Sequence, residues 1–241
     1  MRGAILIVGS LLWDKKKHRI AWRKNRLLLD EKIHVFAPIR YGRESGKNDN
    51  KNYTMVFSSN LEKCKNFGTA YVVPLKNKCS KPFEDLVNEA EQLSIAENSN
   101  ENGDNKLCKG NNSKWCTIGL LLNPKIEKEK KDSLLKKWQQ KLIADNGLKD
   151  YKEYCINNEE ESILSEKGEI LINWLTSVNP NNKTKLNEFD FILATCTKQN
   201  IKDYPKITEL KDSALRDVRE YFFNNITNGI TTFQDREIIK Q

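Results

Sequence analysis

A short apolar run near the N-terminus, residues 3–8, constrains the fold of this chain more than any other segment. It is rich in β-forming residues and stops at Gly9 and Ser10, a pair that is typical of a tight turn. A continuous apolar run of this length is typical of a strand that is buried on both faces. We therefore expect a central β-strand that ends in a glycine-serine turn.

Six further segments have the composition of strands. They are residues 33–39, 53–58, 67–73, 115–122, 169–175 and 189–196. Helices are expected at residues 82–97, 127–143 and 209–226, the last one capped by Thr208 and ended by Asn228 and Gly229. Because strands and helices do not alternate strictly, the order favours an α+β fold over a doubly wound α/β sheet. Seven strands with few helices predict a mixed, barrel-like β-sheet with packed helices.

The chain is expected to form a single domain over residues 1–241. Its 241 residues are enough for a sizeable core, no internal repeat divides the chain, and strand candidates continue beyond residue 125. Residues 43–52 and 98–114 are almost wholly polar. These two segments predict surface excursions that contribute little to the core.

The net charge of +8 is confined to the first quarter of the chain. Residues 1–60 contain 13 Lys and Arg against 5 Asp and Glu, whereas residues 61–241 contain 28 of each. Much of the excess lies in residues 14–26, where a basic surface could attract an anionic small molecule or nucleic acid, or could simply be solvated. Nucleic acid is the lesser expectation. Trp13 and Trp22 are the only aromatic residues near these basic residues, and no nucleic-acid-binding motif accompanies the charge.

The cysteine and histidine pattern gives no support for a metal site. Six cysteines are scattered without a Cys-x-x-Cys pair, and the chain has two histidines. Residues 1–13 resemble a short signal peptide, but they end in a basic cluster without a small-residue cleavage site. No segment approaches the roughly 20 apolar residues of a membrane span. We expect a cytoplasmic protein with no metal, no cofactor and no membrane partner.

Glu97 stands out in the helix expected over residues 82–97. At about 100° per residue, one apolar stripe is formed by Phe83, Leu86, Val87, Ala90 and Leu93. The acids that fall off this stripe are Glu84, Asp85, Glu89 and Glu91, whereas Glu97 falls within it. An inward carboxylate near a helix C-terminus has a raised pKa and suits a general base. The alternative is that the helix frays before residue 97 and that the side chain turns to solvent.

The turn after the first strand is a second candidate site. Successive N–H groups at a glycine-serine turn can bind a carboxylate or a developing oxyanion, and Gly9 allows close approach. The alternative is a turn without further function. Ser10 is not expected to be a nucleophile, because no Gly-x-Ser-x-Gly elbow surrounds it and two histidines leave little choice of a base.

These two features together resemble the gamma-glutamylcyclotransferase superfamily, including its ChaC-like branch, which acts on glutathione. That family has a Tyr-Gly-Ser-x-Leu loop after its first strand, then a Trp-Gly-x-x-Tyr-x-x-Pro strand, a helix, and a catalytic glutamate in Leu-x-x-x-Glu-Gly. The matching segments are Val8-Gly9-Ser10-Leu11-Leu12-Trp13, residues 67–74 and residues 93–98, with Val8 at the family's tyrosine and Asn98 at its last glycine. The resemblance covers about residues 4–122, and residues 123–241 would be an elaboration of that core.

The resemblance implies an enzyme that cyclises a gamma-glutamyl amine or peptide to 5-oxoproline. The substrate's amine attacks its own gamma-carbonyl, a five-membered lactam closes, and an amine or peptide leaves. Glu97 is implied as the general base that takes the amine proton. The implied substrate-binding loop is Val8, Gly9, Ser10, Leu11 and Leu12. The reaction needs no metal or cofactor, because the nucleophile is already tethered to the carbonyl that it attacks.

Arg40 and Arg43 form a secondary candidate for substrate binding. They follow a strand that could share the sheet with the first strand, and their guanidinium groups could meet an anionic part of the ligand. The alternative is a solvated arginine pair.

Two other functions stay open from the sequence. Val8 in place of the tyrosine favours a protein that keeps the pocket but binds another small anion, for example a phosphorylated ligand. A nucleic-acid or protein interaction surface at residues 15–26 would show a steep salt dependence of binding, which neither pocket hypothesis predicts.

Overall fold

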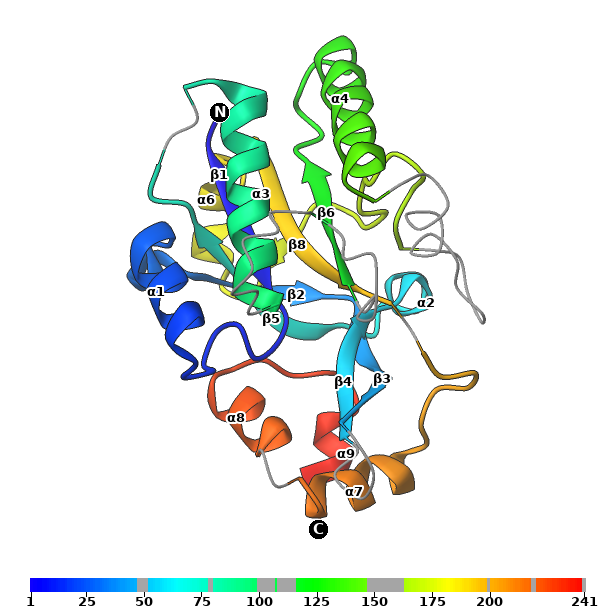
Figure 1. Ribbon diagram of the computed structural model, residues 1–241. Helices are drawn as coiled ribbons and strands as arrows, with labels where there is room; N and C mark the ends of the chain where they lie inside the picture. The colour runs from blue at the N-terminus through cyan, green and yellow to red at the C-terminus, as the bar shows by residue number, and fades with distance from the viewer. Residues whose placement is uncertain are drawn as a thin grey trace.

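The fold is α+β, with helices packed on a mixed six-stranded sheet (Figure 1). It is seen in a computed structural model that describes residues 1–46, 52–77, 80–98, 107, 116–146, 163–198, 200–217 and 220–239. The strand order in the sheet is β6-β8-β1-β5-β2-β7, and β3 and β4 form a separate hairpin. The predicted fold class is confirmed at this level.

Eight strands, eight α-helices and two short 3₁₀ helices, Leu29–Glu31 and Pro180–Asn182, are defined in the described ranges. The strands are β1 (Gly3–Ile7), β2 (Ile33–Ala37), β3 (Ile39–Ser45), β4 (Asn52–Phe57), β5 (Gly68–Pro74), β6 (Cys116–Leu122), β7 (Thr176–Ser177) and β8 (Phe191–Thr197). The helices are α1 (Lys17–Arg26), α2 (Ser59–Lys63), α3 (Pro82–Asn98), α4 (Lys128–Asn146), α6 (Lys183–Leu186), α7 (Ile207–Leu215), α8 (Tyr221–Thr227) and α9 (Asp235–Ile239).

β1 lies in the middle of the sheet, as its continuous apolar sequence predicts. All five of its residues are buried. It pairs antiparallel with β5 and parallel with β8, where Leu6 lies opposite Ala194. Because β1 and β8 run in the same direction, their C-terminal ends meet at the same edge of the sheet. This edge carries the turn after β1 and Thr195 of β8.

The described strands form an open sheet and not a closed barrel. β6 and β7 are its two outer strands, and the β3-β4 hairpin is a separate two-stranded sheet. Pro38 separates β2 from β3, and proline has no N–H group with which to continue a strand ladder. The strand expected over residues 33–39 therefore ends at Ala37, and the barrel-like part of the prediction is not confirmed.

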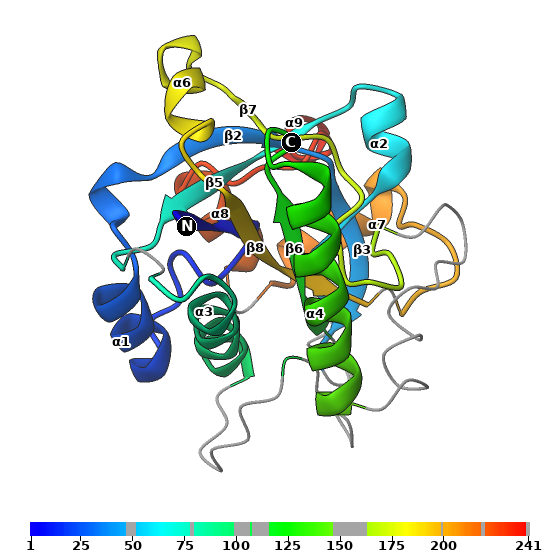
Figure 2. The same ribbon diagram turned by 90° about the horizontal axis from the view of Figure 1, so that it is seen from above.

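α3 and α4 lie side by side on one side of the sheet (Figures 1 and 2). The stripe of α3 that is fully buried consists of Leu86, Ala90, Leu93 and Ala96. Trp138 and Leu142 of α4 are fully buried as well. α1 packs against α3. The two helices predicted over residues 82–97 and 127–143 are thus confirmed, with ends that agree to within three residues.

Several elements differ from the prediction. The sequence reading lacks α1, because residues 17–26 read as a charged run, yet Arg19, Trp22 and Arg23 recur at helical spacing and are buried. The helix expected over residues 209–226 is two helices, and Glu220 just before α8 has a left-handed backbone with φ of 52°. Within residues 169–175, where a strand was expected, Glu169 and Ile170 form isolated bridges and the other residues form none.

The second half of the chain supplies central parts of the structure. β8 lies between β1 and β6 in the sheet. Thr231 pairs with Thr69 of β5, and the Tyr41 hydroxyl donates to Asp235 Oδ1 at 2.8 Å. α7, α8 and α9 gather with the β3-β4 hairpin at one end of the molecule (Figure 1). No helix of the described ranges is long and apolar enough to cross a membrane.

The two expected polar excursions are described only in part. Residues 43–45 belong to β3, and residues 47–51 lie outside the described residues. Of residues 99–114, only Leu107 is described, and its exposed fraction is 1%. Leu107 belongs to the core, and whether the segment as a whole contributes little to it stays a prediction.

Gly68 allows the C-terminal segment to lie against β5. A Cβ atom added at Gly68 would come within 2.1 Å of the Thr231 carbonyl oxygen, a backbone atom. We expect Gly68→Ala to lower the free energy of unfolding by about 1–3 kcal/mol, the usual cost of overpacking a close contact. Chemical denaturation measures this loss. An unchanged denaturation midpoint would contradict the close packing of Thr231 on β5.

Candidate functional site

The segment after β1 folds into a short helix-like turn, residues 9–14, called the Gly9 turn below. The Leu12 N–H donates to the Gly9 carbonyl at 3.2 Å, and the Asp14 N–H donates to the Ser10 carbonyl at 2.8 Å. The N–H groups of Gly9, Ser10 and Leu11 open this turn and donate to no acceptor within the described ranges. Such N–H groups at the start of a helical turn favour anions.

The apolar side chains of the loop anchor it to the core. Leu11 is buried, with an exposed fraction of 5%, and Val8 and Leu12 are partly buried against the core. The polar groups that the loop presents are therefore its backbone N–H groups and the Ser10 hydroxyl. Of the residues predicted as the substrate-binding loop, Val8, Leu11 and Leu12 thus pack toward the core, whereas the Ser10 hydroxyl contacts the Arg19 guanidinium.

Arg23 of α1 supports the Gly9 turn through its carbonyl groups. Its Nη1 donates to the Leu11 carbonyl at 2.6 Å, and its Nη2 donates to the Asp14 carbonyl at 2.7 Å. Arg23 and Arg19 are both buried. The predicted basic surface at residues 14–26 is therefore smaller than its sequence suggests, because two of its arginines are buried and donate hydrogen bonds to carbonyl groups of the protein. Its exposed cations are Lys15, Lys16, Lys17 and Lys24.

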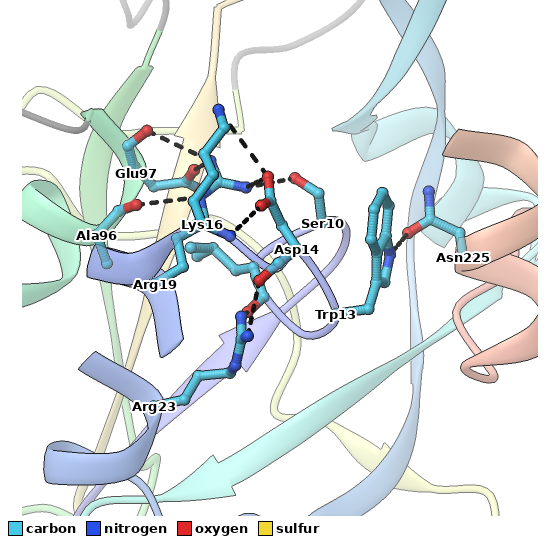
Figure 3. A network of polar contacts seen from close by, with 10 residues as sticks. Ser10, Trp13, Asp14, Lys16, Arg19, Arg23, Ala96, Glu97 and Asn225 are labelled. Carbon is cyan, nitrogen blue, oxygen red and sulfur yellow. Dashed lines mark hydrogen bonds and ion pairs between the residues drawn. The ribbon is translucent and has the colours of Figure 1, made fainter. Parts of the chain in front are cut away.

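Arg19 connects the Gly9 turn to the C-terminal end of α3 (Figure 3). Its Nη1 donates to Ser10 Oγ at 2.8 Å and to Asp14 Oδ2 at 3.0 Å. Its Nη2 donates to Glu97 Oε2 at 3.0 Å, and its Nε donates to the Ala96 carbonyl at 3.1 Å. The side chains of Arg19 and Glu97 are 7% and 10% exposed. One guanidinium group thus fixes the Glu97 carboxylate relative to Ser10.

Glu97 is turned inward, as its helical phase predicts. α3 continues through residue 98, so the helix does not fray before Glu97. Burial raises the pKa of Glu97 above its ordinary value of 4.5, whereas Arg19 and then the Thr195 hydroxyl lower it. The buried Thr195 hydroxyl does not reach the geometry of a full hydrogen bond. The balance of these influences leaves the pKa of Glu97 raised, closer to the range in which a carboxylate acts as a base near neutral pH.

Glu89 is also buried in α3, although its helical phase lies off the apolar stripe. Its Oε1 accepts a hydrogen bond from Arg26 Nη1 at 3.2 Å, because α1 packs on this side of α3. Burial raises the pKa of Glu89 as well. A raised carboxyl pKa therefore does not distinguish Glu97 from Glu89. The position beside the Gly9 turn does.

α8 brings Tyr221 and Asn225, which the sequence reasoning missed, to the Gly9 turn, where both contact Trp13. A Cβ atom added at Gly9 would lie 3.0 Å from Tyr221 Oη. Trp13 Nε1 donates to Asn225 Oδ1 at 2.8 Å (Figure 3). The rings of Trp13 and Tyr221 meet edge to face, and Phe222 packs in the core behind them. About 210 residues separate the two sides of this contact, so no local pattern could have found it.

Arg40 and Arg43 lie on β3 and contact the C-terminal half of the chain. The Arg40 guanidinium lies over the Tyr204 ring, 3.4 Å from its centroid, and Arg43 Nη1 donates to the Lys198 carbonyl at 2.6 Å. The intervening Tyr41 is buried against Phe222. A role of the two arginines in ligand binding stays a prediction.

Other features of the described residues do not suggest a different site. In these ranges no three His, Cys, Asp or Glu side chains are grouped so that they could hold a metal ion. A cleft of about 340 Å³ lies beside Lys125 and Asp190, and one of about 190 Å³ lies beside Arg2 and Glu188. Both are lined by charges of both signs. Neither is lined by Glu97 or the Gly9 turn.

Comparisons of the chain with models of known protein families, with curated proteins and with solved structures gave no match. A function for this chain is therefore inferred from the geometry of this site and from the motifs in the sequence.

The raised pKa of Glu97 predicts a pH-dependent stability. The folded state holds this proton to higher pH than the unfolded chain, whose carboxyl titrates near 4.5, so the free energy of unfolding falls as the pH rises above 4.5 toward the folded pKa. We expect Glu97→Gln to reduce this fall, measured by denaturation at a series of pH values. Glu84→Gln, exposed on the same helix, is the control. Identical pH profiles for the two variants would contradict the raised pKa.

Proposed function

We propose that this chain is a gamma-glutamylcyclotransferase-like enzyme that converts a gamma-glutamyl amine or peptide to 5-oxoproline. The observation that carries the proposal is the link through Arg19 between the buried Glu97 carboxylate and Ser10 of the Gly9 turn. A base and a set of anion-binding N–H groups are thereby held close together. The proposed cyclisation requires both of these groups.

The Gly9 turn is proposed to hold the negative charge of the substrate. The N–H groups of Gly9, Ser10 and Leu11 can donate to the glutamyl carboxylate or to the oxyanion that forms from the gamma-carbonyl. They need no side-chain cation in order to do so, because the start of a helical turn carries a partial positive charge. The nearby Arg19 guanidinium adds a full charge in the same direction.

Glu97 is proposed to move the proton in both halves of the reaction. It accepts a proton from the substrate's amine, whose nitrogen attacks the gamma-carbonyl carbon and forms the ring C–N bond. The resulting oxyanion collapses, and the bond to the leaving nitrogen breaks. Glu97 returns the proton to that nitrogen, so the products are 5-oxoproline and a neutral amine or a peptide.

Arg19 is proposed to orient Glu97 while burial keeps the carboxylate basic. The ion pair lowers the pKa of Glu97, and burial, the larger influence, raises it. A carboxylate with this balance is charged and directed, yet it is a stronger base than an exposed glutamate.

Binding of a small anion without turnover is the second candidate. The observation that favours it is the ion pair itself, because Glu97 Oε2 already accepts a hydrogen bond from Arg19. In this case the Gly9 turn would bind a carboxylate or a phosphorylated ligand, and Glu97 would only hold the arginine in place.

Replacement of Glu97 tests the enzymatic proposal. We expect Glu97→Gln to lower 5-oxoproline release from a panel of gamma-glutamyl amines and peptides, glutathione included, by about 10²- to 10⁴-fold, the usual contribution of a general base. Glutamine has nearly the same shape, so the fold should be retained. Release is measured by chromatography, together with a circular dichroism spectrum of each variant.

Glu84→Gln is the matched control, since Glu84 lies on the same helix and is exposed. Its turnover should equal that of the wild type. Unchanged turnover in Glu97→Gln would remove Glu97 from the mechanism. No release by the wild-type protein on any member of the panel would favour the anion-binding candidate.

A further inference from the structure

The Tyr221 hydroxyl lies directly against the Gly9 turn. A Cβ atom at Gly9 would be 3.0 Å from Tyr221 Oη, so glycine leaves the space that the hydroxyl occupies. Tyr221 is the first residue of α8, and its ring meets the Trp13 ring with centroids 6.1 Å apart. α8 therefore lies against the Gly9 turn at Gly9 and at Trp13.

The proton of this hydroxyl has no acceptor within the described part of the chain. Tyr221 Oη accepts a long hydrogen bond of 3.5 Å from the Met55 N–H. A phenol has one O–H donor, and no carbonyl or carboxylate of the described residues receives it. Tyr221 is partly buried against the core, where polar groups are normally paired, so its free donor indicates a place for an acceptor.

Asn225 provides a second, independent sign that an acceptor belongs at this place. Its exposed fraction is 0%, and its Oδ1 accepts from Trp13 Nε1, which fixes the orientation of the amide. Asn225 Nδ2 is then turned away from Trp13 and makes no hydrogen bond. It lies close enough to Tyr221 Oη to favour negative charge there. Beside the turn, Asn225 Nδ2 thus makes no full hydrogen bond, and the Tyr221 hydroxyl proton has no acceptor among the described residues.

The raised pKa of the Tyr221 hydroxyl is consistent with its role as a hydrogen-bond donor. Burial raises the pKa of Tyr221 to about 12, and the negative charge of Glu97 contributes to the rise. The hydroxyl therefore keeps its proton at neutral pH, and it can donate a hydrogen bond but cannot act as a base.

We propose that the Tyr221 hydroxyl donates a hydrogen bond to the anionic oxygen of the ligand held by the Gly9 turn, and that Asn225 is the positioning residue that supports this hydroxyl. The inference rests on the proposed function, because it assigns the Gly9 turn as the ligand site. It adds that α8, more than 200 residues along the chain, completes that site. The recognised oxygen belongs either to the glutamyl carboxylate or to the oxyanion of the cyclisation.

Tyr221→Phe is the decisive variant, because it removes the hydroxyl and keeps the ring. If the oxygen is the oxyanion, kcat should fall by about 10²- to 10³-fold with little change in KM. If it is the carboxylate, KM and the Kd for 5-oxoproline should rise by about 10- to 100-fold, the range for a hydrogen bond to a charged group. Tyr71→Phe is the matched control, because the Tyr71 hydroxyl also lies against a glycine, Gly229, but on β5. It should leave both constants unchanged.

The outcomes separate this inference from the proposed function. Loss of turnover in Glu97→Gln with unchanged kcat and KM in Tyr221→Phe would overturn the inference and leave the proposed function standing. If the wild type releases no 5-oxoproline, the proposed function fails. The inference about Tyr221 is then tested by the binding of 5-oxoproline and of inorganic phosphate. Binding to the wild type should shift the amide signals of Gly9 and Ser10 in NMR titrations, and Tyr221→Phe should weaken that binding. Equal affinity of wild type and variant, or no binding to the wild type, would overturn the inference.

Asn225→Asp tests the positioning role. Aspartate keeps the acceptor for Trp13 Nε1 but replaces the Nδ2 donor near Tyr221 by a negative charge. We expect the Tyr221 hydroxyl to ionise at higher pH, seen as a shift in its ultraviolet titration curve, and kcat/KM to fall by about 10-fold or more. Tyr221→Phe identifies the Tyr221 component of that curve. An unshifted component would overturn the positioning role of Asn225.

Discussion

The geometry of the candidate site depends on one guanidinium group. Arg19 binds Ser10 and Asp14 of the Gly9 turn and Glu97 at the end of α3. Its planar fork of donors can meet these partners at once, which the single ammonium of lysine cannot do in the same geometry. It also compensates two carboxylates in a largely buried place, where an unpaired charge is costly. Without it, neither the position nor the charge of Glu97 would be defined.

The parts of the fold that could be predicted are those in which local pattern and final environment agree. β1 is a continuous apolar run, and α3 carries a regular apolar stripe, so both follow from periodicity. α1 could not be predicted in this way, because its buried face includes two arginines. Their burial depends on carbonyl and carboxylate groups from other segments, and the local sequence does not show which groups these are. The break at Pro38 has a local signal, since proline ends a strand ladder.

The same distinction applies to the candidate site. Gly9 and Glu97 were found because one sits at a turn signal and the other breaks the amphipathic pattern of its helix. Tyr221 and Asn225 lie in a short helix whose sequence, residues 221–227, gives no reason to single them out. Their proximity to the Gly9 turn arises only from the path of the C-terminal segment along β5 and the hairpin. A contact of this range becomes visible only in three dimensions.

The placement of β8 beside β1 has a consequence for how this chain acquires its shape. During synthesis β1 emerges long before its partner on one side, residues 191–197. Until then, one edge of an entirely apolar strand has no neighbour, and such edges are prone to pair with other chains. The pairing of β1 with β8 is also slow, because closing so long a loop of chain costs conformational entropy. A nascent chain that is stalled or truncated before residue 191 would thus expose the edge on which the whole molecule is later assembled, and it would be a natural client for chaperones.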